Sequence, residues 1–166
     1  MRARFCIWCG RRLGTVREEG RRRRRCHGCE WTYYDNPVPA TVALIERGGR
    51  VLLTRRARPP YAGTWDLPGG FLEADESPEA GLRRELREEL GVRTRRATFV
   101  MFARDRYGPR GFPVLTLVYR LSATGTVRPA DDVTEARWFA QDRLPMSQIG
   151  FPSVRRLLRA RYSRRS

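Results

Sequence analysis

Residues 70–92 read GFLEADESPEAGLRRELREELGV, and this stretch predicts a single helix with a buried seam and an acidic edge. Ser77 is a suitable N-cap, Pro78 fits the first helical position, and Gly91 can end the helix. Leucines recur at every fourth position and form a stripe that can pack against a sheet: Leu82, Leu86 and Leu90.

Three glutamates crowd one side of this helix. Glu85, Glu88 and Glu89 are spaced i, i+3 and i+4, so they lie within about one helical turn of one another. Carboxylates beside a buried seam repel one another, and a hard divalent cation such as Mg²⁺ relieves that repulsion. The alternative is a solvated amphipathic helix whose charges face water. For such a helical segment taken alone the solvated helix is the more usual interpretation, and the residues around it decide between the two.

The wider stretch resembles the Nudix box. That box is a glycine, five residues of any type, a glutamate, seven of any type, then Arg-Glu, an aliphatic residue, any residue, Glu-Glu, any residue, Gly and an aliphatic residue. Gly70, Glu76 and residues 84–92 fill every fixed position at the required spacing. The resemblance implies an α+β fold, a Nudix-type α/β/α sandwich with a mixed sheet between helices, over about residues 37–160.

The resemblance also implies a reaction. Nudix enzymes use Mg²⁺ or Mn²⁺ to hydrolyse a phosphoanhydride bond in a nucleoside diphosphate derivative. In such enzymes the glutamates and a glycine carbonyl bind the metal, the box arginine orients the glutamates, and Glu76 would anchor the turn before the helix. The residues that take the metal-binding and catalytic roles here are Gly70, Arg84, Glu85, Glu88 and Glu89.

Further site residues are expected outside the box. Arg56 matches a position at which related enzymes hold a phosphate with arginine. Glu135 precedes a late strand and is a candidate general base, with a box glutamate as the alternative. Trp65, Tyr107 and Phe112 are candidates for stacking on a nucleobase, although packing in the core or in a lid explains them equally well.

The rest of the second segment reads as strands, loops and a terminal helix. Gly48-Gly49 predicts the turn of a hairpin, residues 142–144 predict a short helical turn, and Val154, Leu157 and Leu158 mark a terminal amphipathic helix. The expected strands cover residues 41–45, 51–54, 65–67, 97–103, 114–121 and 135–140.

Composition bounds the class of protein. A chain of 166 residues suits one domain plus a small appendage, and 40% hydrophobic residues can build a core. No stretch reads as a signal peptide or as a membrane span, so we expect a cytoplasmic protein without a membrane partner. The net charge is +16 and every basic residue is arginine. That usage reflects either a GC-rich genome or attraction for phosphate-rich ligands.

All four cysteines lie in the first segment as two CxxC pairs: Cys6 with Cys9, and Cys26 with Cys29. Such pairs predict a structural Zn²⁺ held by four thiolates, and two disulfides are the alternative. A segment this short builds little core, so the metal would supply much of its folding free energy. The turn-rich link at residues 35–39 places a zinc ribbon at residues 1–36 and a Nudix hydrolase domain at residues 37–166.

Five consecutive arginines, residues 21–25, lie between the cysteine pairs. As a solvated loop of the ribbon, they would be kept extended by mutual repulsion. As a binding element, this Arg-rich surface would contact RNA, DNA or a polyphosphate. Aromatic residues nearby can stack on bases or pack the ribbon: Trp8, Trp31, Tyr33 and Tyr34.

The combination of a four-cysteine ribbon and a Nudix box resembles NADH pyrophosphatase and ADP-ribose pyrophosphatase-like members. The Ser-Gln-Pro-Trp-type signature of the NADH pyrophosphatases is absent from residues 98–107, and the stretch at residues 147–152 comes too late to supply it. Pro109 lies near the position of a proline in ADP-ribose pyrophosphatases.

The favoured substrate is therefore ADP-ribose or an NAD(H)- or FAD-type dinucleotide. Two other readings stay open. One is a zinc-ribbon module that binds nucleic acid or senses a nucleotide without catalysis, and the other is decapping of nucleotide-capped RNA. A homodimer would be usual for such enzymes.

Overall fold

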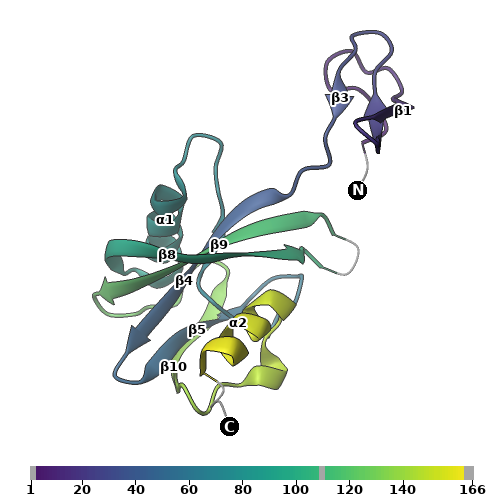
Figure 1. Cartoon of the computed structure of the whole chain (residues 1–166). Coiled ribbons are helices and arrows are strands. Elements are labelled where there is room, and N and C mark those ends of the chain that lie inside the picture. Colours follow the sequence, from purple (N-terminus) through teal and green to yellow (C-terminus); the bar gives the residue numbers. More distant parts are fainter. Residues whose placement is uncertain (1–2, 109–110, 163–166) are drawn as a thin grey trace. The chain divides into compact units, whose positions relative to one another are not determined.

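A computed structural model describes residues 3–108 and 111–162, which fall into two compact units, one up to Pro37 and one from Val38. The first unit contains a three-stranded antiparallel sheet in the order β1-β2-β3 (Figure 1). Its strands are Gly14–Glu18, Arg21–Arg25 and Thr32–Tyr33. The expectation of a solvated arginine loop is wrong, because the run forms the central strand and pairs on both sides.

The second unit is built on a seven-stranded sheet in the order β10-β5-β4-β9-β8, with β6 paired to β5 and β7 paired to β4. Strands β4 and β9 are parallel and the other pairs are antiparallel, which confirms the expected mixed sheet. The strands are β4 Val38–Arg47, β5 Arg50–Arg56, β6 Trp65–Asp66, β7 Gly69–Phe71, β8 Arg93–Arg106, β9 Pro113–Thr124 and β10 Val133–Ala140.

Helix α1 spans Pro78–Leu90 and confirms the helix expected from the opening stretch. The Ser77 Oγ accepts the N–H of Ala80 at 3.2 Å, which caps the first turn. Gly91 takes the left-handed conformation at φ 65°, and its N–H closes the last turn on the carbonyl of Arg87. The three seam leucines are fully buried, so the helix is held by its packing on the sheet.

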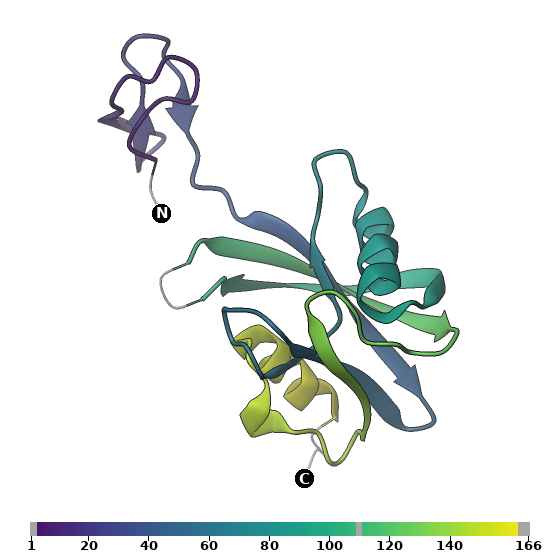
Figure 2. The ribbon, with the colours of Figure 1, turned by 180° about the vertical axis from the view of Figure 1, so that it is seen from behind.

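Helix α2, Pro152–Tyr162, packs on the opposite face of the sheet from α1 (Figures 1 and 2). Alternation along β4 divides the core, because Val42 and Leu44 pack with α2 whereas Ala43 and Ile45 pack with α1. The helical turn expected at residues 142–144 lies later, as the 3-10 turn Met146–Gln148. Among the described residues, no helix combines the length and the apolar character needed to cross a membrane.

Candidate active site

A cleft of about 300 Å³ opens in the second unit, between the wall formed by β4, β7 and β9 and the helix α1. Strand β7 and the second half of α1, through Glu85 and Glu89, place the box stretch on one side of it. Its acidic lining includes Asp66, Glu85, Glu89, Asp105, Asp131 and Asp132. Its aromatic lining consists of Phe71, Tyr107 and Phe151. The cleft therefore combines a cluster of carboxylates with flat apolar rings.

Glu89 is the most unusual carboxylate in the cleft, because it is only 5% exposed. Its Oε2 accepts the N–H of Gly69 at 2.9 Å, and no cationic side chain among the described residues pairs with it. Burial raises the pKa of Glu89 to about 9, and the nearby carboxylates of Asp132 and Glu85 act in the same direction. A buried carboxylate without a cation is a suitable ligand for a divalent metal.

Arg84 holds the other box carboxylates in place. Its guanidinium makes a two-pronged contact with Glu76 at 2.7 and 2.9 Å, and it also donates to the carbonyl of Phe71 at 3.1 Å. The Nη1 of Arg84 donates to Glu85 at 2.8 Å and to Glu88 at 3.0 Å. The hydrogen bonds from Arg84 lower the pKa of Glu76 to about 2. Of the three helical glutamates, Glu85 and Glu89 line the cleft and Glu88 does not.

Two glycines let β7 approach its neighbours, with Gly70 facing helix α1 and Gly69 facing strand β4. A Cβ on Gly70 would lie 2.5 Å from the carboxylate of Glu85, so any larger residue would displace that side chain. Gly69 has φ +134°, and a Cβ there would lie 2.2 Å from the carbonyl oxygen of Thr41. The absence of a side chain on Gly70 brings the backbone of β7 directly against Glu85, and the N–H of Gly69 reaches Glu89.

Arg56, at the end of β5, lies between the acidic and aromatic linings. It donates through Nη2 to the hydroxyl of Tyr107 at 3.2 Å and through Nε to the carbonyl of Pro60 at 2.9 Å. Its Nη1 lies 3.6 Å from Asp66, a buried carboxylate whose pKa is raised to about 7, mainly by burial. The guanidinium also lies 5.3 Å from the centre of the Phe151 ring. These contacts fix a positive charge in the cleft.

The structure separates the three candidate stacking residues. Tyr107 lines the cleft, where its ring centroid lies 5.0 Å from that of Phe71. Trp65 is 3% exposed and packs edge-on against Phe139, so it is a core residue rather than a stacking surface. Phe112 stacks on Tyr107 at 5.5 Å without lining the cleft itself.

The candidate base Glu135 also lies outside the cleft lining, on β10. It pairs with Arg55 at 3.5 Å and with Arg137, so its charge is already balanced. Asp131 and Asp132, in the loop before β10, line the cleft instead. Asp132 lies near enough to Glu85 and Glu89 to raise the pKa of both.

Sequence reasoning therefore missed several lining residues. Asp131 and Asp132 could have been found from the sequence, because they form an acidic pair just before the late strand that contains Glu135, the residue proposed as the base. Asp66 and Phe151 carried none, since only the folded sheet brings them to the same cleft. Pro109, noted for its resemblance to ADP-ribose pyrophosphatases, lies outside the described residues.

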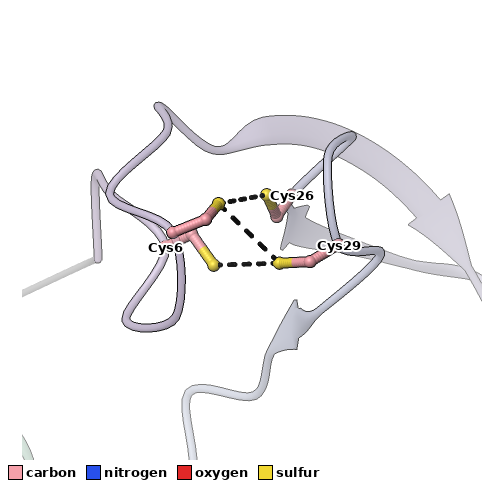
Figure 3. Close-up of side chains that lie close together, drawn as sticks. Cys6, Cys26 and Cys29 are labelled. Atoms are coloured by element: carbon pink, nitrogen blue, oxygen red, sulfur yellow. Dashed lines mark hydrogen bonds between the residues drawn. The ribbon is translucent and has the colours of Figure 1, made fainter.

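The first unit brings all four cysteine sulfurs within 4.8 Å of one another. The Sγ atoms of Cys6 and Cys29 are 3.3 Å apart, and those of Cys9 are 3.4 Å from Cys26 and 3.8 Å from Cys29. Figure 3 shows the labelled thiols pointing toward one another. A disulfide needs about 2.05 Å, whereas thiolates on a tetrahedral Zn²⁺ lie about 3.8 Å apart. The sulfur positions therefore fit a single metal ion better than two disulfides.

Comparisons with known proteins agree on one family. A family model described as NUDIX domain matches residues 35–160. A NUDIX hydrolase from Nitrosomonas europaea aligns with 98% of this chain and 92% of its own at a TM-score of 0.77 and 27% identity. A MutT NUDIX hydrolase from Burkholderia pseudomallei aligns with 78% of this chain and 99% of its own at a TM-score of 0.69 and 32% identity.

Two kinds of curated relative resemble the chain. An ADP-ribose pyrophosphatase from Methanocaldococcus jannaschii is 34% identical over 119 residues, which cover 70% of this chain and 69% of the relative. An NAD-capped RNA hydrolase from Pseudomonas aeruginosa is 32% identical over 168 residues. That match covers 98% of this chain but 57% of the relative, so the chain spans little more than half the length of such proteins.

We expect the metal-free protein to lose stability as the pH rises from about 4.5 to about 9. Glu89 has an ordinary pKa of 4.5 when unfolded and a pKa of about 9 when folded, so the unfolded chain binds fewer protons throughout this window. The free energy of unfolding must then fall with rising pH. Urea unfolding in magnesium-free buffer measures this slope.

Glu89→Gln should flatten that pH dependence, whereas the exposed control Glu88→Gln should retain it. An equal slope in Glu89→Gln and in the parent chain would contradict the assignment of the effect to Glu89.

Proposed function

Because the chain belongs to the Nudix hydrolase family, we propose that its cleft hydrolyses a phosphoanhydride bond in ADP-ribose or in an NAD(H)- or FAD-type dinucleotide. The observation that carries the proposal is the buried Glu89 carboxylate beside Glu85, in a cleft that also holds a fixed arginine and three aromatic rings. The ADP-ribose pyrophosphatase relative supports the choice of substrate.

We assign the divalent metal, Mg²⁺ or Mn²⁺, to the carboxylates of Glu85 and Glu89 and the backbone carbonyl of Gly70. These residues suit such an ion because they offer hard oxygen atoms close together, and one of them, the buried Glu89, has no cationic partner among the described residues. We also propose Glu88 as a ligand, because it shares Arg84 with Glu85. When bound, the metal neutralises phosphate charge and lowers the pKa of a coordinated water.

The protein's own residues would do the rest of the chemistry. The attacking water gives its proton to a general base as its oxygen bonds to phosphorus, and the bond between that phosphorus and the bridging oxygen breaks. We propose Asp132 as this base in place of Glu135. Asp132 lines the cleft beside Glu85 and Glu89, whereas Glu135 is engaged by two arginines outside it. A box glutamate is the alternative base.

Substrate binding would use the other half of the cleft. Arg56 is held by Asp66, Pro60 and Tyr107, so it offers a pre-positioned charge to a phosphate. The rings of Phe71, Tyr107 and Phe151 offer flat surfaces on which a nucleobase can stack. This pairing of a charge with aromatic rings supports a nucleotide rather than an inorganic polyphosphate.

A second candidate substrate is a nucleotide-capped RNA. The matches to relatives that hydrolyse NAD-capped RNA cover 98% of this chain, so they extend into the first unit. Decapping breaks the same kind of bond in a longer molecule, so the cleft residues would keep their roles. An RNA partner bound through the Arg-rich surface would accompany this substrate, and a homodimer stays a prediction.

We further propose that residues 1–36 form a zinc ribbon and residues 37–166 the hydrolase domain. The positions of the four sulfurs support a structural Zn²⁺. Backbone N–H groups also point at the thiols, since that of Trp8 donates to the Sγ of Cys6 and that of Gly28 to the Sγ of Cys26, each at 3.4 Å. Such hydrogen bonds stabilise the thiolate relative to the thiol, and the thiolate is the form that binds zinc.

The main test is a screen with Mg²⁺ and Mn²⁺ over ADP-ribose, NADH, FAD, nucleoside diphosphate sugars and nucleoside triphosphates. We expect ADP-ribose or a dinucleotide to show the highest kcat/KM. Glu89→Gln and Glu85→Gln should each lower kcat by about 10²-fold or more, because each removes charge where the metal binds. Glu79→Gln, on the same helix but not in the cleft lining, is the matched control.

A second pair of variants distinguishes the candidate bases. Asp132→Asn should lower kcat by about 10²- to 10⁴-fold, because it removes the proton acceptor, whereas Glu135→Gln should stay near the parent value. Steady-state kinetics with saturating metal measures both. The opposite result would return the role to Glu135, and two fully active variants would move it to a box glutamate.

Metal analysis tests the ribbon. Protein purified under reducing conditions should contain about one zinc per chain, because four thiolates satisfy one tetrahedral ion. Cys26→Ser should abolish this zinc, and the neighbouring substitution His27→Ala should keep it. Zinc-free parent protein that still gives the ribbon's dispersed amide NMR signals would defeat the proposal.

A further inference from the structure

The five arginines of β2 divide between the two faces of the ribbon sheet. Side chains alternate along a strand, so Arg22 and Arg24 lie on one face and the other three on the opposite face. Residues directly across an antiparallel pair share a face. The register places Arg17 opposite Arg22, and it places Thr15 and Tyr33 on either side of Arg24.

The face that carries Arg21, Arg23 and Arg25 also carries acidic partners. Glu18 lies 3.9 Å from both Arg23 and Arg25, and it stands directly across from Arg21 in the register. Two further contacts add to this balance: Arg23 lies 3.9 Å from Glu19, and Arg25 lies 3.5 Å from Glu30. Much of the positive charge on this face is therefore neutralised within the unit.

The other face, which we call the arginine face, consists of Arg17, Arg22 and Arg24 with Thr15 and Tyr33. Within residues 3–108 and 111–162, no carboxylate lies within 4.0 Å of these three guanidinium groups. Arg24 donates to the Thr15 hydroxyl at 3.1 Å instead.

The arginine face is also hollowed. A concavity of about 500 Å³ is lined by Thr15, Arg22, Arg24 and Tyr33 together with Asp35 and with Arg23 of the opposite face. A second of about 360 Å³ is lined by Thr15, Arg17 and Arg22 together with Val16 of the opposite face. Asp35 is the one carboxylate in these linings, and it accepts the hydroxyl of Tyr33. The two hollows share Thr15 and Arg22, so they form one continuous cationic surface.

We propose that the arginine face binds the phosphate backbone of single-stranded RNA. Alternate residues of a strand stand about 7 Å apart, so the face presents guanidinium groups in a row rather than at a single point. Guanidinium groups bind phosphate oxygens in pairs, and threonine and tyrosine hydroxyls add further phosphate contacts. The open, charged hollows lack the buried apolar anchor that a protein partner requires, which favours a polyanionic strand.

The choice of RNA rests on the proposed function, because a cleft that cleaves nucleotide phosphoanhydrides fits a nucleotide-capped RNA. The difference in charge between the two faces of the ribbon sheet does not depend on the proposed function. The experiment therefore measures RNA binding and nucleotide hydrolysis separately.

The test compares full-length variants that lose the same charge from opposite faces. Arg17→Ala/Arg22→Ala removes two groups from the arginine face, and Arg23→Ala/Arg25→Ala removes two from the glutamate-bearing face. Binding to a labelled oligouridine is measured across a salt series. For the first variant the log–log salt slope should fall by about 1.4, since each lost phosphate contact contributes about 0.7. The control should change the slope far less.

If the control Arg23→Ala/Arg25→Ala loses its zinc and therefore its fold, a second matched pair of single variants replaces it. Arg22→Ala and Arg21→Ala change neighbouring exposed residues on opposite faces, and only Arg22→Ala should reduce the slope. Hydrolysis of free ADP-ribose should be the same in all variants and in the parent. Failure of the parent to hydrolyse ADP-ribose, NADH and FAD alike would reject the proposed function, while the slopes would still test the arginine face.

Three outcomes would overturn the inference. Equal losses of slope from the two faces would show that only net charge matters. An unchanged slope in the variants of the arginine face would show that RNA binds elsewhere. Equally tight binding of a polyglutamate peptide of matched charge would show that the face does not select nucleic acid.

Discussion

The side chain of Arg84 joins the loop after β7 to helix α1, and the geometry of the cleft depends on that junction. One guanidinium holds Glu76, Glu85, Glu88 and the carbonyl of Phe71 at distances of 2.7–3.1 Å. The leucine seam fixes the helix to the sheet, and these contacts fix which way the side chains of Glu85 and Glu88 face. Glu89 is left out of this network, so no cation among the described residues offsets the cost of ionising this buried carboxyl group.

The charge distribution supports the same chemistry at two length scales. The chain carries a net charge of +16, so its field attracts phosphate-bearing molecules from a distance. Within the cleft the balance reverses, because several carboxylates face Arg56 and Arg58. A bound divalent cation would restore the balance there and bring substrate phosphates next to carboxylates that would otherwise repel them.

The sequence allowed correct predictions wherever a few neighbouring residues determine the structure. The caps and leucines of α1 follow from spacing along one helix, and the four sulfurs meet because each CxxC pair forms a tight turn. Predictions that depended on distant strands fared less well. Trp65 proved to be core, and Asp66 and Phe151 reach the cleft only through sheet pairing. The arginine run was expected to form a loop because mutual repulsion of its side chains was considered alone. In the structure, glutamates of the neighbouring strand and turns offset part of that repulsion.

The aromatic lining of the cleft has a different origin from its acidic lining. Glu85 and Glu89 come from a single helix, but Phe71 ends strand β7, and Tyr107 and Phe151 come from two connections far apart in the chain. Tyr107 and Phe151 can therefore each be exchanged by altering one loop, without moving the helix that carries the carboxylates. During divergence, such an arrangement uncouples the choice of nucleotide from bond cleavage, so new preferences can evolve while the reaction itself is inherited intact.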